Sequence, residues 1–166
     1  MTQQTRFASL ADYRKGEIEL ISGSRKEYAF SNIFEVADTS KPYERVAVGK
    51  NLEYVQEAVR AEGESGWYLC AHDEFAVCMD GAVEVELLKP DDARALVPED
   101  KNGAISLGAK APSGRKMGVI RLKRGHQAML NKDCAYRFRA DKPAVLLIQT
   151  ILGDVTIEKW AKICLQ

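Results

Sequence analysis

The chain has 166 residues, of which 46% are hydrophobic, and its 24 basic and 24 acidic side chains leave no formal net charge. This length fits one globular domain with its own core. The balanced charge excludes the concentrated basic face of a nucleic-acid-binding protein, and no apolar run reaches the roughly 20 residues of a membrane span. Residues 1–6 are polar and lack the apolar stretch of a signal peptide, so we expect a cytoplasmic protein.

Alternation of apolar and polar residues is the dominant pattern along the chain, and it is typical of half-buried β-strands. Residues 1–27 are less regular and are predicted to form an N-terminal arm, with one short strand at 17–21. The segment 54–61 also fits one face of a helix. The predicted strands of the main body are 28–36, 43–49, 54–61, 67–71, 74–80, 83–87, 116–123, 126–130, 135–140 and 144–151.

Glycine and proline mark the turns between these strands. The Asp80-Gly81 step lies between two alternating segments and predicts a tight hairpin. Residues 89–114 are polar and rich in turn-forming residues, so we expect a long excursion between two strands of the main body. Loops of this length are often functional or contact a partner.

The last residues of the chain have helical spacing. Apolar side chains recur at i, i+3, i+4 and i+7, and Thr156 is placed to cap such a helix. These apolar residues are Ile157, Trp160, Ala161 and Cys164. The sequence therefore predicts an arm at 1–27, a barrel at 28–152, and a helix at 153–166 that packs on the barrel or on a partner.

Two segments resemble the sequence motifs of the cupin superfamily. Residues 67–81 keep the glutamate of the first motif as Glu74 and its glycine, after six intervening residues, as Gly81. Residues 125–140 begin with Gly125 and resemble the second motif. The resemblance implies an all-β cupin fold, a double-stranded β-helix or jelly-roll barrel, which agrees with the many short strands.

Most of the residues that hold a divalent metal in cupins are replaced in this chain. The two histidine positions of the first motif fall on Tyr68 and Cys70, and the third falls on Tyr136, so only Glu74 is retained. Neutral imidazole is a good ligand for such metals, whereas a phenol with a pKa near 10 is a poor one. We therefore expect no metal in this chain. Tyr136 shares its strand face with Phe138 and is predicted to point inward and fill the barrel.

One other metal site stays open at this point. His72, Glu74 and His126 supply two histidines and a carboxylate, the ligand set of many non-haem iron oxygenases. His126 lies at the start of its strand, far from the Tyr136 position, which argues against this set. In the competing interpretation, His72 forms a hydrogen bond with a carboxylate such as Asp73, and His126 packs at a rim of the barrel.

Longer segments of the chain resemble the small subunit of two-component hydroquinone 1,2-dioxygenases. The resemblance implies an accessory subunit of an enzyme that opens hydroquinone to 4-hydroxymuconic semialdehyde, as in bacterial breakdown of p-nitrophenol. It also implies that iron(II) is held by a larger cupin subunit in an α2β2 heterotetramer, with a small aromatic diol bound at the interface. The segments that carry it are residues 28–36, 43–48, 51–55, 57–81, 114–118, 124–126 and 155–165.

Trp67 is the residue that the resemblance connects to the substrate. In the family, a tryptophan of the small subunit reaches the substrate pocket of the large one, and by motif position this is Trp67. A tryptophan at this place can equally cap the barrel core, because large aromatic side chains serve both purposes.

Two further functions are compatible with the sequence. The first is a stand-alone, metal-free cupin that binds or isomerises a small molecule, with Glu74, His72 and Tyr136 as polar groups in the barrel. The second is a complete mononuclear dioxygenase with an unusual ligand set. Co-purification with a larger cupin would separate the accessory subunit from both, and metal content would separate the two.

Overall fold

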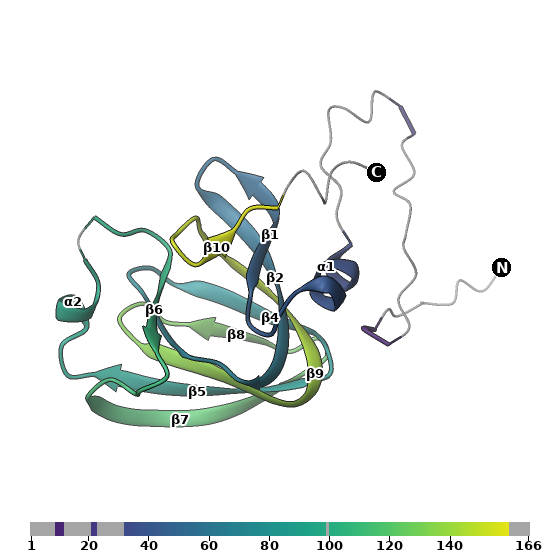
Figure 1. The fold of residues 1–166 in the computed structure, drawn as a ribbon. Helices are drawn as coiled ribbons and strands as arrows, with labels where there is room; N and C mark the ends of the chain where they lie inside the picture. Colours follow the sequence, from purple (N-terminus) through teal and green to yellow (C-terminus); the bar gives the residue numbers. More distant parts are fainter. Residues whose placement is uncertain (1–8, 12–20, 23–31, 99, 160–166) are drawn as a thin grey trace.

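The computed structural model describes residues 9–11, 21–22, 32–98 and 100–159. In this part of the chain, strands dominate and the two helices are short (Figure 1). None of the helices described is long and apolar enough to cross a membrane. The elements are α1 (Ile33–Thr39), β1 (Arg45–Asn51), β2 (Tyr54–Glu64), β3 (Trp67–Cys70), β4 (Glu74–Asp80), β5 (Ala82–Pro90), α2 (Ala93–Leu96), β6 (Ala104–Gly108), β7 (Gly114–Lys123), β8 (Gln127–Leu130), β9 (Ala135–Ile151) and β10 (Thr156–Ile157).

Strand β9 is the spine of the fold. Its 17 residues pair antiparallel with β2 and then β3 along one edge, and with β4 and then β5 along the other. β1 and β10 extend the sheet beyond β2, β6 extends it beyond β3, β8 beyond β4 and β7 beyond β5. Figure 1 shows the sheet curling around an interior. This arrangement confirms the all-β cupin barrel that the sequence predicted.

The core forms where the two halves of β9 face each other across the barrel. Tyr136 and Phe138 come from the first half, and Leu146 and Ile148 come from the second; none is more than 1% exposed. Alternate residues of a strand point to the same face, so both halves of β9 direct apolar side chains inward. The inward direction predicted for Tyr136 is confirmed.

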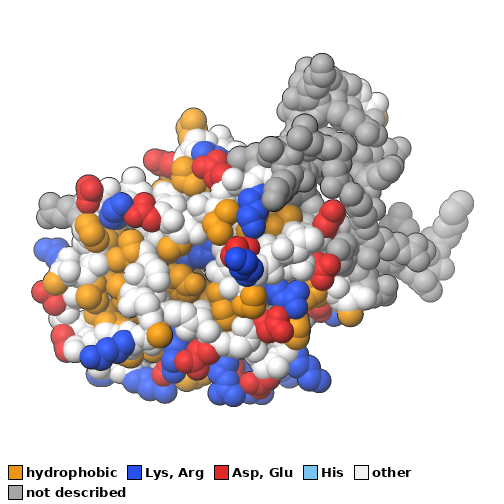
Figure 2. All heavy atoms as spheres, in the orientation of Figure 1, with side chains coloured by type: hydrophobic (Ala, Val, Ile, Leu, Met, Phe, Trp, Pro, Cys, Tyr) orange, Lys and Arg blue, Asp and Glu red, His pale blue; other side chains and the backbone are white. Residues whose placement is uncertain are grey.

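The outer face of β5, β7 and β9 carries a ladder of charged side chains. Glu86 pairs with Lys116 at 2.8 Å and with Arg137 at 2.7 Å, and Glu84 pairs with Arg121. Figure 2 shows these charge types along the lower border of the molecule, where Figure 1 places β5 and β7. Exposed pairs of this kind contribute little to stability, so the ladder mainly keeps this face of the sheet in water.

The strand predicted for residues 28–36 is wrong where the structure describes it. Residues 33–39 form helix α1, and 28–31 lie outside the described residues. Asn32 begins the helix, because its side-chain oxygen accepts hydrogen bonds from the backbone N–H groups of Phe34 and Glu35. Within α1 the buried Val36 and Ala37 make the side that faces the sheet. The alternation seen in the sequence was therefore overridden by a helix cap.

The hairpin predicted at Asp80-Gly81 is also wrong. Gly81 has a positive φ of 73° and turns the chain, but β4 and β5 do not pair with each other. Both strands instead follow β9, so that Asp80 lies opposite Val145 and Glu84 lies opposite Arg139. Gly81 is thus a corner at which the chain leaves β4, along one half of β9, and enters β5, along the other half.

The C-terminal helix does not begin where the sequence predicted. Thr156 and Ile157 form strand β10, which pairs in parallel with Arg45 and Val46 of β1. The rest of the predicted helix, with its apolar positions Trp160, Ala161 and Cys164, lies outside the described residues, as do the predicted strand residues 17–20.

The other predicted strands are confirmed, including the ambiguous segment 54–61, which lies in β2. The segments 135–140 and 144–151 belong to one strand, β9. The excursion at 89–114 contains α2 and β6, and β6 adds to the sheet beside β3.

The corner at Gly81 generates a stability prediction. Gly81→Ala places a Cβ atom 2.7 Å from the Cβ of Ala144 and forces alanine to a φ of 73°. Gly63 has the same φ, but a Cβ there meets nothing within 4 Å. We expect Gly81→Ala to lower the free energy of unfolding by about 3 kcal/mol and Gly63→Ala by about 1 kcal/mol. Urea unfolding followed by circular dichroism measures both, and equal losses would contradict the close approach at Gly81.

Candidate functional site

The interior of the barrel holds a buried arginine. Arg45 is the first residue of β1, it is 2% exposed, and its side chain points between the strands. Moving a charge out of water is costly unless partners of opposite charge and hydrogen-bond acceptors surround it. The contacts of Arg45 therefore decide what this interior can do.

Each nitrogen of the Arg45 guanidinium contacts a different partner. Nε donates to Glu57 at 2.5 Å, Nη2 donates to Glu74 at 2.6 Å, and Nη1 donates to the hydroxyl of Tyr136 at 2.9 Å. Both glutamate side chains are fully buried. Charge-assisted hydrogen bonds of this kind are the strongest that side chains make.

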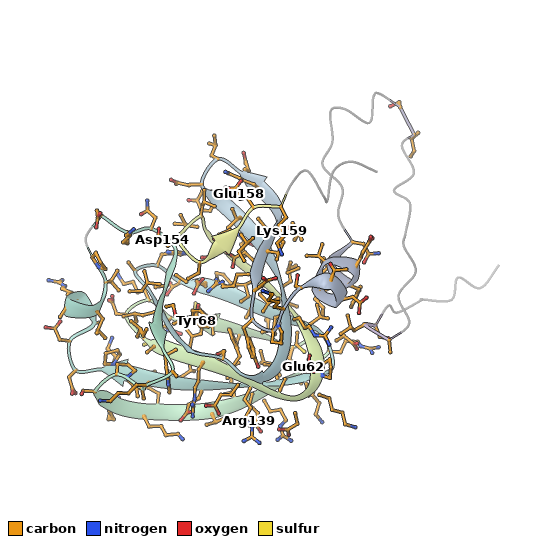
Figure 3. All side chains as sticks on the ribbon, viewed as in Figure 1. Glu62, Tyr68, Arg139, Asp154, Glu158 and Lys159 are labelled. Atoms are coloured by element: carbon orange, nitrogen blue, oxygen red, sulfur yellow. The ribbon has the colours of Figure 1, made fainter. Side chains whose placement is uncertain are left out.

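The remaining oxygens of the two glutamates are also occupied. The Tyr136 hydroxyl donates to the second oxygen of Glu74, and the Thr156 hydroxyl donates to the second oxygen of Glu57 at 2.6 Å. The ring of Tyr68 lies 5.6 Å from the Arg45 guanidinium, at cation–π distance. Figure 3 shows Tyr68 inside the ring of strands, whereas Arg139 lies at the outer border. We call Arg45, Glu57, Glu74 and Tyr136 the arginine network.

The charges of the arginine network fix its protonation. Burial alone would raise the pKa of the Glu74 carboxyl, but the Arg45 charge and the Tyr136 hydrogen bond hold this pKa below its usual value. Burial, followed by the Glu74 charge, raises the pKa of the Tyr136 phenol well above its usual value. Burial opposes the charge of Arg45, but the nearby Glu74, Tyr136 and Glu57 raise its pKa. At neutral pH the network therefore contains a carboxylate, a neutral phenol and a guanidinium.

Three of the four positions that the cupin resemblance assigns to metal ligands meet at this guanidinium. Glu74 and Tyr136 bond to it, and Tyr68 stacks against it. The fourth, Cys70, lies to one side and contacts His72. Sequence reasoning missed Arg45, because an arginine in an alternating segment is normally a solvent-facing residue. No local signal in residues 43–49 distinguishes it from one.

Cys70, His72 and Glu74 form a cluster of potential metal ligands, each with a ligand atom within 4.8 Å of the others. His72 Nε2 accepts the Ile151 backbone N–H at 3.2 Å, so its proton is on Nδ1, which faces the Cys70 sulfur at 2.9 Å. Nε2 also lies 3.1 Å from the Thr150 hydroxyl. The predicted hydrogen bond from His72 to Asp73 is wrong; Asp73 accepts the backbone N–H of residue 132.

This cluster does not fit a divalent metal. Both oxygens of Glu74 are engaged by Arg45 and Tyr136. Burial, followed by the Glu74 charge, raises the pKa of the Cys70 thiol to about 12, and a metal needs the thiolate. Burial lowers the pKa of His72, which is therefore neutral, but its free lone pair is used by the backbone. A metal at this place would also lie next to the positive charge of Arg45.

His126 does not join His72 and Glu74. Strands β4 and β8 pair antiparallel. His126 lies at one end of this pair, where its backbone carbonyl accepts the Cys78 N–H, and Glu74 lies at the other end, opposite Leu130. The ring of His126 accepts the backbone N–H of Lys123 at 3.2 Å, and the residue is exposed. The position of His126 at the barrel rim agrees with the competing interpretation. The structure does not bring His72, Glu74 and His126 together as one metal site.

Trp67 lies in a second apolar cluster, separate from the arginine network. The side chain is 2% exposed and packs with Leu69, Leu88 and Ala135, under residues of α2 and β6. The guanidinium of Arg137 lies 5.0 Å from its ring. Among the described residues, the indole N–H is the buried side-chain donor without an acceptor. In this chain, then, Trp67 caps the core, and its N–H has no acceptor among the described residues.

A shallow, largely open pocket of about 400 Å³ lies next to the arginine network. Arg45 and Tyr68 line its inner part together with Tyr43, Ser106 and Ile157. The hydroxyl of Tyr68 makes no hydrogen bond with the described part of the chain, whereas that of Tyr43 donates to the backbone of Gly63 at 2.7 Å. The pocket offers an apolar rim and a few polar groups, as many small-molecule sites do.

Solved structures show what the chain is similar to. It is 55% identical to a chain of hydroquinone 1,2-dioxygenase from Sphingomonas sp. TTNP3 with 4-hydroxybenzoate bound, with a TM-score of 0.93 over 98% of each chain. It is 53% identical to a chain of hydroquinone 1,2-dioxygenase PnpCD in complex with Cd2+ and 4-hydroxybenzonitrile, with a TM-score of 0.89, covering 99% of this chain and 98% of that one. No protein-family model and no curated protein matches the chain.

A longer chain has the same fold. In hydroquinone 1,2-dioxygenase PnpCD in complex with Fe3+, a chain 12% identical to this one aligns with a TM-score of 0.59. The alignment covers 87% of this chain but 39% of that chain. At this identity the likeness shows the fold alone.

The arginine network generates a stability prediction with a matched control. Tyr136→Phe removes the hydroxyl that links Arg45 to Glu74, and leaves a charged nitrogen and a carboxylate oxygen without a partner. We expect a loss of about 2–3 kcal/mol in the free energy of unfolding. Tyr68→Phe removes a hydroxyl of the same kind that bonds to nothing described, so its loss should stay below about 0.5 kcal/mol. Similar losses in urea unfolding would show that the Tyr136 hydroxyl does not bridge the charges.

Proposed function

Because the chain belongs to the hydroquinone 1,2-dioxygenase family of ring-cleaving enzymes, we propose that it is the small subunit and that it does not carry the catalytic iron. In this proposal a larger cupin subunit holds iron(II), and the assembly opens hydroquinone to 4-hydroxymuconic semialdehyde. This chain supports the larger subunit and closes one wall of its substrate pocket.

The observation that carries the proposal is the arginine network. A cupin that binds iron needs open coordination positions at the barrel centre. Here the centre contains a guanidinium, Arg45, which is bonded to Glu74 and Tyr136 at positions that correspond to metal ligands. A barrel built in this way needs a partner to supply the metal.

The lengths of the matching chains support two kinds of subunit. The present chain covers 98% of one chain of PnpCD, but 39% of a second chain with the same fold that also carries the name of this enzyme. The second chain comes from the complex of that enzyme with Fe3+. We propose that a chain of the longer kind is the partner, in an α2β2 heterotetramer with a small aromatic diol at the interface.

Apolar side chains on the surface are consistent with a partner. Phe75 of β4 and Met129 of β8 lie opposite each other in the sheet, and they are 45% and 48% exposed. Neighbouring large apolar side chains are unusual on a surface that faces only water. Figure 2 shows a further gathering of apolar side chains in the middle of the visible face.

We propose Trp67 as the residue of this chain that contributes to the substrate pocket. A buried N–H without an acceptor costs free energy, and the indole of Trp67 has none in the described structure. The side chain is 2% exposed in this chain, so in this proposal the covering residues of α2 and β6 move aside in the complex, and the partner subunit or its bound substrate supplies the acceptor. In this arrangement Trp67 helps to exclude water from the reaction, which strengthens the polar interactions within the pocket.

A stand-alone, metal-free cupin is the second candidate, and the pocket next to the arginine network favours it. The pocket lies beside Arg45 and the hydroxyl of Tyr68, which bonds to nothing in the described part of the chain, and it has room for a small phenol. This function needs no partner, so the purified chain alone should be active, whereas the accessory subunit should be active only together with its partner.

Purification with and without the partner tests the proposed function. We expect the full chain to co-purify with the larger cupin, and neither chain alone to cleave hydroquinone. The complex should contain about one iron for each pair of unlike chains, and the iron should stay with the larger chain when the two are separated under anaerobic conditions. Ring cleavage by this chain alone, or iron retained on it, would contradict the proposal.

A substitution at Trp67 tests its part in the pocket. Trp67→Phe keeps an aromatic ring in the second cluster but removes the N–H group. In the complex, we expect kcat/KM for hydroquinone to fall by about 10-fold, the worth of one hydrogen bond, with the assembly and its iron content unchanged. Tyr54→Phe, an exposed tyrosine of β2 outside the pocket and both clusters, is the control and should have wild-type kinetics. Unchanged kinetics in Trp67→Phe would remove this residue from the pocket.

A further inference from the structure

We propose that Arg45 takes the place of the metal in this barrel as a resident cation, and that its guanidinium covers a latent divalent-cation site formed by Glu57 and Glu74. All the residues of this site belong to the present chain. The site is therefore present whether the chain works as an accessory subunit or alone.

The position of the guanidinium is the first argument. Tyr68, Glu74 and Tyr136 come from three strands, and the cupin motifs place metal ligands at their positions. In the structure all three converge on Arg45, at contact distances of 2.6 Å for Glu74 and 2.9 Å for Tyr136 and at 5.6 Å for the Tyr68 ring. The guanidinium therefore lies where these three positions would surround a metal ion in other cupins.

The chemistry of the surrounding groups is the second argument. A guanidinium is planar, permanently charged and presents several N–H donors in a fixed arrangement. Glu57, Glu74 and the Tyr136 oxygen accept from three different nitrogens of Arg45. A neutral phenol accepts such a hydrogen bond readily but is a poor metal ligand. The replacement of histidine by tyrosine at position 136 thus suits an arginine and not a metal.

The two buried carboxylates are the third argument. Glu57 and Glu74 are fully buried, and among the described residues Arg45 is the cation that contacts both. Without the guanidinium they would lie in the core with no positive charge beside them, which is unfavourable by several kcal/mol in known cases of this kind. Carboxylate oxygens that face a common space are also what a divalent cation prefers. Truncation of Arg45 should therefore open a site for such an ion between the two carboxylates.

Cobalt binding by the full-length chain tests this inference. Three proteins are stripped of metal with a chelator and then dialysed against Co²⁺: the wild type, Arg45→Ala, and the double variant Arg45→Ala/Glu74→Gln. We expect fewer than about 0.1 tightly bound ions per chain in the wild type, about one in Arg45→Ala, and again fewer than about 0.1 in the double variant. Cobalt is used because its visible absorption reports the ligands that surround it.

Thermal unfolding gives a second readout. The melting temperature of Arg45→Ala should lie below that of the wild type, because it loses the cation of the arginine network. Co²⁺ at about 100 times its dissociation constant should raise it by roughly 5–10 °C, and leave the wild type and the double variant unchanged. Tight cobalt in the wild type, or none in a folded Arg45→Ala, would overturn the inference. Equal binding by the single and double variants would overturn it as well.

A variant that does not fold still gives a result. If Arg45→Ala is recovered unfolded, it is refolded with and without Co²⁺, and folding with Co²⁺ alone supports the inference, whereas no folding in either case counts against it. The triple variant Arg45→Met/Glu57→Gln/Glu74→Gln carries neither the cation nor its carboxylates. It should fold without metal, since neutral side chains of similar size often replace a buried ion pair. A requirement for cobalt in the triple variant would refute the role of the two carboxylates.

Discussion

The need to satisfy one buried positive charge organises the interior of this barrel. Arg45 lies in an enclosed core, where an unpaired charge is far more costly than in water. Its partners come from β2, β4 and β9, and the Thr156 hydroxyl of β10 completes Glu57. Because each partner is fully engaged, a shift of any one strand would leave a charge without a partner. The network therefore specifies how these strands meet as well as holding them together.

The same network occupies the centre of the barrel with a side-chain cation. A barrel of this shape can hold a cation at its centre, and in this chain that cation is the guanidinium of Arg45. The carboxylate of Glu74, which the cupin pattern retains, serves the guanidinium. In the proposed function, the reacting centre of the enzyme therefore belongs to another subunit.

The arginine network and the proposed substrate-contacting residue lie in separate parts of the molecule. The arginine network lies in the main core, whereas Trp67 belongs to a second cluster next to α2 and β6. Substitutions at Trp67 therefore leave the charges of the arginine network in place. For the same reason, the stability of the barrel and the kinetics of an assembly can be measured as separate properties of single variants.

The sequence by itself determined most strands of the barrel and the inward face that carries Tyr136, because these depend on residue type and on a period of two. Only the tertiary structure decided that α1 replaces a strand, that β10 replaces a helix start, and that Arg45 is buried. Its partners Glu57, Glu74 and Tyr136 lie 12, 29 and 91 residues away along the chain. An alternating pattern reports which face a side chain occupies, but it carries no information about the groups that meet it across the barrel.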